Sequence, residues 1–255
     1  MKIVVGIDMG SVATKCVVLK NGEVIAKALV NTGVDTEQSA EIGFKMALDQ
    51  GKISEAEISN IVSTGYGRRL FTRADKIVTE ISAVALGAAV LTKDNNFLIV
   101  DVGGQDTKVV EVGEKGDVLD FLMNDKCAAG TGRFLEIMAQ VLETDLSGFS
   151  ELALKSHNPV TINSTCSVFA ESEIISLLSK AAKKEDIAGG LVKSIALRIS
   201  SMMSQFGKKE STFFCGGGAK CEPLRRALEE ARGVAISVID TPQFVAALGA
   251  AWSAL

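Results

Sequence analysis

The sequence repeats itself, and this repeat limits the folds that are open to it. Without gaps, the segment that begins at Asp8 aligns with the segment that begins at Asp101, as far as Asn31 against Asn124. Each copy predicts a hydrophobic strand, a turn, a second strand, another turn and a third strand, which is a three-stranded meander. The matched residues at the first turn are Asp8 and Asp101, Gly10 and Gly103, Thr14 and Thr107, and Lys15 and Lys108.

Two further matches follow in the same order. Residues 63–68 (Ser-Thr-Gly-Tyr-Gly-Arg) align with residues 215–220 (Cys-Gly-Gly-Gly-Ala-Lys), and Ala-Leu-Gly-Ala-Ala occurs at 85–89 and at 247–251. Small side chains let two helices pack with their backbones close together, as a pair of hinge helices would need. The repeat therefore predicts an α/β protein that reads βββαβα twice, with helices on the faces of each sheet.

The second copy is longer than the first, because residues 126–210 lie between its meander and its next strand. Apolar spacing predicts helices in this insertion at 131–142, 168–183 and 187–206. We therefore expect a first lobe at 1–92 and a second at 93–255, with any specialised function in the insertion.

Composition excludes several classes of protein. The net charge of -4 is spread over interspersed acids and bases, so no basic field for nucleic acid is expected. The apolar stretches 81–92 and 244–255 are too short to cross a bilayer.

A strand is predicted from Ile3, so no signal peptide is expected and the cytoplasm is the predicted location. An odd number of cysteines, five, favours free thiols over a disulfide framework.

Each repeat places an acid at a strand end, Asp8 and Asp101, before a turn whose N–H groups can face a phosphate. Brought face to face, the two carboxylates would orient a hydrated magnesium ion. Gln105 either positions a hydrolytic water or caps its own backbone. The glycines at 216–218 precede a predicted helix at 222–232 and leave bare backbone for a base and ribose. Taken singly, each turn could equally be an ordinary hairpin.

Together, in this order, these turns resemble the phosphate-1, phosphate-2 and adenosine signatures of the actin, sugar-kinase and heat-shock-chaperone superfamily. The Ala-Leu-Gly-Ala-Ala helices resemble its connecting helices. The resemblance implies a duplicated actin-like ATPase (ribonuclease-H-like) fold that binds ATP or ADP with Mg²⁺, with Asp8, Asp101 and Gln105 in catalysis. The residues expected to bind the nucleotide are Gly10, Ser11, Val12, Ala13, Thr14, Lys15, Gly103, Gly104, Gly216, Gly217, Gly218, Lys220 and Gln243.

Other nucleotide and hydrolase motifs are missing from the sequence. It contains no Walker A loop and no dinucleotide fingerprint. The single histidine, His157, precedes Asn158-Pro159 and is predicted to lie in a surface loop, which argues against Ser-His or Cys-His hydrolysis.

Two cysteines, Cys127 and Cys166, each precede a predicted helix, where backbone N–H groups favour an anionic thiolate or cluster. Two thiolates cannot complete a four-cysteine site, but a two-fold dimer can supply four, enough for one [4Fe-4S] cluster on its axis. From spacing alone, a lone cysteine is commonly a small core hydrophobe.

The strings at 124–135 and 166–173 resemble the two cluster-ligand motifs of the 2-hydroxyacyl-CoA dehydratase activators, and residues 64–68 are similar to another string of that family. The resemblance implies a homodimeric ATPase in which Cys127 and Cys166 of both copies hold one bridging [4Fe-4S] cluster. It also implies ferredoxin or flavodoxin as electron donor and an iron–sulfur enzyme as acceptor. Cys16, Cys215 and Cys221 are interpreted as ordinary thiols.

One departure from that family leaves the acceptor open. The activators usually continue with Cys-His-Ala where this chain has Ala83-Val84-Ala85. A 2-hydroxyacyl-CoA dehydratase, an aryl-CoA reductase and a double-cubane cluster protein all remain candidates. Two other functions compete with this one: a small-molecule kinase of the same fold, with an acidic residue as base, and a nucleotide-gated binding module or chaperone fragment.

Overall fold

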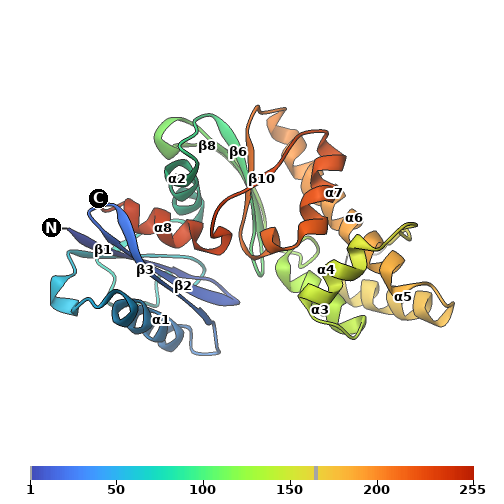
Figure 1. Cartoon of the computed structure of the whole chain (residues 1–255), viewed down its shortest axis with the longest axis horizontal. Helices are drawn as coiled ribbons and strands as arrows, with labels where there is room; N and C mark the ends of the chain where they lie inside the picture. The colour runs from blue at the N-terminus through green and yellow to red at the C-terminus, as the bar shows by residue number, and fades with distance from the viewer. Residues whose placement is uncertain (1, 164–165) are drawn as a thin grey trace. The chain divides into compact units, whose positions relative to one another are not determined.

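The structure is a computed structural model that describes residues 2–163 and 166–255, so Ser164 and Thr165, beside the second cysteine string, lie outside it. The chain forms two five-stranded sheets, with strand orders β3-β2-β1-β4-β5 and β10-β9-β6-β7-β8 (Figure 1). Each predicted meander is present, which confirms the duplicated α/β architecture. The short strands β5 and β10, at the ends of the two sheets, were not predicted because two residues give no readable pattern.

The strands of the first sheet are β1 (Ile3–Met9), β2 (Ala13–Lys20), β3 (Glu23–Asn31), β4 (Asn60–Thr64) and β5 (Lys76–Ile77). Those of the second are β6 (Phe97–Val102), β7 (Thr107–Val112), β8 (Val118–Asn124), β9 (Thr212–Cys215) and β10 (Ser237–Val238). The helices are α1 (Thr36–Gly51), α2 (Glu80–Thr92), α3 (Gly132–Val141), α4 (Leu146–Leu154), α5 (Ser167–Ser179), α6 (Lys184–Met203), α7 (Glu222–Arg232) and α8 (Val245–Trp252).

The contacts divide the chain into two compact units. The first unit contains the residues up to Ile99, residues 110–121 and residues 239–255, and the second contains residues 100–109 and 122–238. Helix α8 therefore packs within the first unit, although the repeat assigns it to the second copy. The lobe limits at 92 and 93 remain a prediction drawn from the repeat.

Strand β1 is buried along its whole length because helices cover both faces of its sheet. Its side chains alternate: Ile3 and Ile7 join the core that contains Phe44 of α1. A Cβ atom on Gly6, on the other face, would collide with the carbonyl oxygen of Ala247 in α8. Figure 1 shows α1 and α8 on opposite sides of this sheet. Glycine at position 6 thus lets α8 approach the strand directly.

The two Ala-Leu-Gly-Ala-Ala segments form parts of α2 and α8, which pack against each other. A Cβ on Gly87 would meet the carbonyl oxygen of Val245, and one on Gly249 would meet that of Ala83. The predicted packing of backbone against backbone is therefore confirmed. No helix in the described ranges is both long and apolar enough to cross a membrane.

The insertion contains the three predicted helices, as α3, α5 and α6, and one that was not predicted, α4. The start of α4 has a local signal, because the side chain of its N-cap Asp145 accepts a hydrogen bond from Gly148 N at 2.8 Å. Helix α6 supplies much of the insertion's core, since Leu191, Ile195 and Ile199 are all buried.

Candidate nucleotide and cysteine sites

The turn after β1 carries the first group of predicted nucleotide residues. Asp8 is 5% exposed, and its Oδ2 accepts a hydrogen bond from Lys15 Nζ at 3.0 Å. Thr32 Oγ1 donates to Gly10 O at 2.8 Å and also lies 2.9 Å from Thr14 Oγ1. These contacts connect the turn to the end of β3. Gly10, Ser11, Val12 and Ala13 are only partly buried, so their backbone remains accessible to a ligand. The first unit therefore presents a fixed carboxylate beside an accessible turn.

The turn after β6 carries the second group, and its lysine is buried. Lys108 is 1% exposed and pairs with Asp106 at 2.6 Å and with Asp101 at 3.5 Å. Asp106, which holds this lysine in place, was not among the predicted site residues; its alternation with Lys108 was the available signal. Gln105 is exposed and Gly103 and Gly104 are partly exposed, so either role considered for Gln105 remains open.

The glycines after β9 serve the packing of the second unit. Gly216 has φ +82°, and a Cβ there would collide with Asp101 Oδ1 and Val102 O. A Cβ on Gly218 would collide with the side chain of Val102. The adenosine-type turn therefore lies directly on the end of β6, and Lys220 beside it is exposed. The remaining predicted residue, Gln243, is partly buried in a short 3₁₀ turn, Pro242–Phe244, of the first unit.

The corresponding turn of the first unit corrects our alignment by one residue. Gly65 has φ +92°, and a Cβ there would lie 2.6 Å from Asp8 Oδ1, just as one on Gly216 would collide with Asp101 Oδ1. Gly65 therefore corresponds to Gly216, not Gly217, and Thr64 corresponds to Cys215. The shared Gly-x-Gly spacing was the signal that could have given this register.

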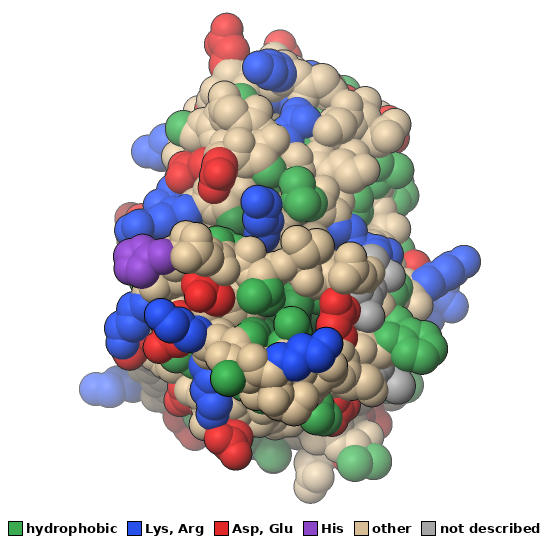
Figure 2. Space-filling model, turned by 90° about the vertical axis from the view of Figure 1, so that its right-hand side faces the viewer, with side chains coloured by type: hydrophobic (Ala, Val, Ile, Leu, Met, Phe, Trp, Pro, Cys, Tyr) green, Lys and Arg blue, Asp and Glu red, His purple; other side chains and the backbone are tan. Residues whose placement is uncertain are grey.

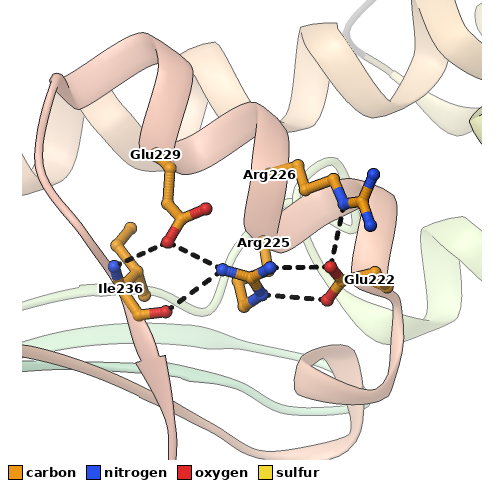
Figure 3. A network of polar contacts seen from close by, with 5 residues as sticks. All are labelled: Glu222, Arg225, Arg226, Glu229 and Ile236. Atoms are coloured by element: carbon orange, nitrogen blue, oxygen red, sulfur yellow. Dashed lines mark hydrogen bonds and ion pairs between the residues drawn. The ribbon is translucent and has the colours of Figure 1, made fainter.

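Helix α7 follows the adenosine-type turn and is fixed by a polar network (Figure 3). Arg225 donates to Glu222 at 2.6 and 2.9 Å and pairs with Glu229 at 2.7 Å, while Arg226 donates to Glu222 at 2.9 Å. Hydrogen bonds from Arg225, the largest cause, hold the pKa of Glu222 at about 2. Glu229 also accepts from Ile236 N at 2.9 Å. The network thus ties the start of α7 to the segment that enters β10.

The loop between β8 and α3 carries Cys127, which is partly buried. Asn124 Nδ2 donates to Cys127 O at 3.0 Å and to Ala129 O at 3.1 Å, so the loop is held from within. The N-cap of α3 is Thr131, four residues later, so the prediction that Cys127 lies at a helix N-terminus is wrong. The same prediction is confirmed for Cys166, which is the N-cap of α5 and is exposed.

Three hydrogen bonds join the loop of Cys127 and the start of α3 to the turn after β6 (residues 103–106, the phosphate-2 turn) and to the first residue of β7. Thr107 Oγ1 donates to Gly130 O at 2.6 Å, Gly132 N donates to Gly103 O at 2.8 Å, and Arg133 N donates to Gly104 O at 2.8 Å. All of these residues belong to the second unit. The turn, the start of α3 and the cysteine loop are therefore held together by direct hydrogen bonds within one unit.

The other cysteines differ from this pair because all three are buried. Burial raises the pKa of Cys16 and of Cys221, and Ser150 Oγ donates to Cys221 Sγ at 3.6 Å. Within the described residues, no group of three or more His, Cys, Asp or Glu side chains could hold a metal ion. One copy of the chain thus has two thiols outside the buried core, the exposed Cys166 and the partly buried Cys127.

Figure 2 shows the molecule from the side of the helical insertion, with hydrophobic side chains scattered among lysines, arginines and carboxylates. The exposed hydrophobic residues of the insertion include Phe169 and Ile175 of α5, which are 67% and 56% exposed. Helix α5 therefore presents apolar side chains just beyond Cys166.

Two sheets of the same topology, each with an acid at the end of its first strand, define the class of actin-like ATPases. A hexokinase of the ROK family from Thermus thermophilus supports this fold, with a TM-score of 0.56 at 16% identity and coverage of 98% of both chains. The profile of the BadF/BadG/BcrA/BcrD ATPase family matches residues 5–254, and the chain belongs to that family.

Its relatives include two dehydratase activators. The chain is 44% identical over 248 residues to the (R)-2-hydroxyglutaryl-CoA dehydratase activating ATPase of Acidaminococcus fermentans, covering 96% of this chain and 94% of the relative. It is 42% identical over 247 residues to the 2-hydroxyisocaproyl-CoA dehydratase activator of Clostridioides difficile, covering 96% and 92%.

Solved structures agree with these relatives. The crystal structure of component A of the A. fermentans (R)-2-hydroxyglutaryl-CoA dehydratase has a TM-score of 0.94 at 42% identity, and it covers 99% of this chain and 97% of its own. The Clostridium difficile activator with bound ADPNP has a TM-score of 0.93 at 41% identity, covering 99% and 94%.

Proposed function

We propose that this protein uses ATP hydrolysis to drive single low-potential electrons into an iron–sulfur dehydratase or reductase. The observation that carries this proposal is the set of hydrogen bonds that joins the phosphate-2 turn and the start of β7 to the loop of Cys127 and the start of α3. A kinase needs a turn that binds phosphate, but it has no need for that turn to be bonded to a loop that presents a thiol. An activator does need such a link, because ATP hydrolysis at the nucleotide site must change the properties of the cluster that the cysteines would hold.

The roles of the nucleotide residues follow from their placement. Asp8 would orient the hydrated Mg²⁺ of the nucleotide, because a carboxylate at the end of a strand faces the turn that follows it, and Asp101, which the repeat matches to Asp8, is proposed to have the same role. Lys15 and Lys108 hold these two carboxylates in place through ion pairs. Gln105, which is exposed, would position the attacking water.

The cysteines fit a shared cluster and do not fit a site within one chain. Cys127 and Cys166 are the two cysteines that are not buried, and a pair of thiolates is half of a four-cysteine set. A homodimer would bring the set to four, and a [4Fe-4S] cluster bound there would supply a one-electron carrier. Backbone N–H groups at the start of α5 would stabilise its negative charge beside Cys166.

The partners follow from this chemistry. Ferredoxin or flavodoxin would donate the electron, and a 2-hydroxyacyl-CoA dehydratase is the favoured acceptor, since the two relatives above are named as activators of such enzymes. A component of the benzoyl-CoA reductase of Thauera aromatica is 28% identical to this chain over 269 residues, which keeps a reductase among the candidates.

The test uses anaerobically purified protein, a chemically reduced ferredoxin and a 2-hydroxyacyl-CoA dehydratase. We expect about four irons per dimer and reduction of the dehydratase with ATP but not with ADP. Reduction at the full rate without nucleotide would contradict the coupling. A colourless preparation without iron that phosphorylates a small molecule would support the kinase instead.

A further inference from the structure

Two buried polar atoms of the first unit stand out at the end of its sheet. Within the described ranges, Asp8 Oδ1 and Thr64 Oγ1 are buried side-chain atoms that have no hydrogen-bond partner. Asp8 is 5% exposed and Thr64 is fully buried. Leaving such groups unsatisfied is costly, and a bound ion or its water is one way in which a protein satisfies them.

These two atoms belong to one place in the structure. Strands β1 and β4 are parallel neighbours, and Asp8 is the register partner of Thr64. Partners in adjacent parallel strands project from the same face of the sheet. Gly65, the residue after Thr64, lies against the same carboxylate, since a Cβ there would be 2.6 Å from Asp8 Oδ1. A hydroxyl donor and a carboxylate acceptor therefore share one small region.

The local fold does not need the Thr64 hydroxyl. The turn after β4 is held by Ser63 Oγ, which donates to Arg68 O at 2.7 Å, and by Gly67 N, which donates to Met9 O at 2.9 Å. The other oxygen of Asp8 is already held by Lys15. What remains is one carboxylate oxygen and one hydroxyl, which suits the bound water of a hydrated cation.

We infer that Thr64 is a positioning residue for the nucleotide's magnesium ion: its hydroxyl and Asp8 Oδ1 together hold one water of the hydrated Mg²⁺. This inference rests on the proposed ATP site and adds a residue to it. The second unit lacks the equivalent group, because Cys215 stands in the place of Thr64 and a thiol is a weak donor and acceptor. The first unit is thus the one that holds this water.

The test compares Thr64→Val with Thr64→Ser and with Ser63→Ala. Ser63 is a matched control, because it is equally buried and neighbouring, but its hydroxyl is already bonded to Arg68 O. Calorimetry would give the Kd of ADP with and without Mg²⁺, and thermal unfolding of the nucleotide-free protein would report on the fold.

We expect Mg²⁺ to tighten ADP binding in the wild type and Thr64→Val to reduce this tightening roughly tenfold, as for one lost hydrogen bond to a charged assembly. Thr64→Ser should keep it. The melting temperature of nucleotide-free Thr64→Val should equal or exceed that of the wild type, because an unsatisfied hydroxyl has been removed. Ser63→Ala should melt about 2–4 °C lower and keep the Mg²⁺ effect.

The possible negative results distinguish the role of Thr64 from the proposed magnesium site itself. A Thr64→Val protein that keeps the full Mg²⁺ effect, or that melts lower or fails to fold, overturns the role of Thr64 while the ATP site stands. A wild type whose ADP affinity ignores Mg²⁺ overturns the proposed magnesium site and this inference together.

Discussion

Replacing the hydroxyl of Thr107 is the sharpest test of the proposed link between the nucleotide site and the loop of Cys127. Thr107 is 1% exposed, lies in β7 beside the phosphate-2 turn, and donates to the buried Gly130 O at 2.6 Å. Thr107→Val keeps the shape of the side chain and removes this donor. The carbonyl that loses its partner belongs to the loop of Cys127, so the change acts on the link and leaves both ends of it chemically intact.

The expected effects on the melting temperature and on the reduction potential follow from the loss of this one hydrogen bond. A buried carbonyl left without its donor costs about 1–3 kcal/mol, and each 1 kcal/mol lowers the melting temperature by about 2–4 °C in a chain of this size. Coupling between two sites is typically about 1–3 kcal/mol, which is roughly 40–130 mV for one electron. Thr107 supplies one of three bonds across the link. Its removal should therefore reduce the nucleotide-dependent shift in potential by about a third, roughly 15–40 mV.

The assay is a redox titration of the same anaerobic preparation with ADP and then with ADP plus aluminium fluoride. Thr92→Val is the control for stability, because the Thr92 hydroxyl donates to Ala88 O at 2.9 Å at the end of α2. We expect both variants to melt at a lower temperature than the wild type. Only Thr107→Val should reduce the difference between the midpoint potentials with ADP and with ADP plus aluminium fluoride. An undiminished difference in Thr107→Val would refute the link through Gly130 O. Equal potentials in the two wild-type states would move the coupling to partner docking.

Three further predictions test the proposed sites. Asp101→Asn should lower ATP hydrolysis by orders of magnitude and leave the iron content unchanged, as measured by phosphate release and iron analysis; normal turnover would move the catalytic centre elsewhere. Cys166→Ser should abolish iron binding, whereas Cys16→Ser should keep about four irons per dimer, and iron retained in Cys166→Ser would refute the ligand assignment. The pKa of Glu222 is lowered to about 2, so its pairing with Arg225 stabilises the fold above the usual glutamate pKa and is lost as pH falls toward 2. Arg225→Gln should thus lower the melting temperature at pH 7 and converge with the wild type near pH 2; a gap independent of pH would contradict the ion pair.

Much of the fold could be predicted because the duplication is written in local patterns. A strand, a glycine turn and a second strand are specified by residues that are close in sequence, and the matched Asp8 and Asp101 mark where the first strand of each meander ends. The small-residue helices could be paired because the same string, Ala-Leu-Gly-Ala-Ala, occurs in both copies and small side chains allow close packing. The alignment of the later turn failed by one residue because it was made without a gap, while the structure places Gly65 opposite Gly216.

The site was harder to predict, since it depends on contacts between distant segments. The sequence indicates an acid and a lysine in each turn, but it does not reveal that Lys108 is buried between Asp101 and Asp106. The bonds from Gly132 N and Arg133 N to the phosphate-2 turn are made by backbone atoms, which leave no mark on residue choice. Nor does composition reveal that the Thr64 hydroxyl is unsatisfied, because this is a property of its surroundings.

The start of α3 is the place where the proposed coupling between the nucleotide and the insertion would act. The first amides of a helix have no partner within it and are usually satisfied by a capping side chain. Helix α1 has such a cap, since Asp35 accepts a hydrogen bond from Gln38 N. The N-cap of α3, Thr131, makes no such bond, and its hydroxyl donates to Ala128 O instead.

Carbonyl groups of the phosphate-2 turn accept from the first amides of α3, so this turn is the cap of the helix. A cap contributes about 0.5–2 kcal/mol, which overlaps the range of a typical allosteric coupling. Under the proposed mechanism, a rearrangement of the turn on hydrolysis would uncap α3 or move it, and the loop of Cys127 would move with the helix that follows it.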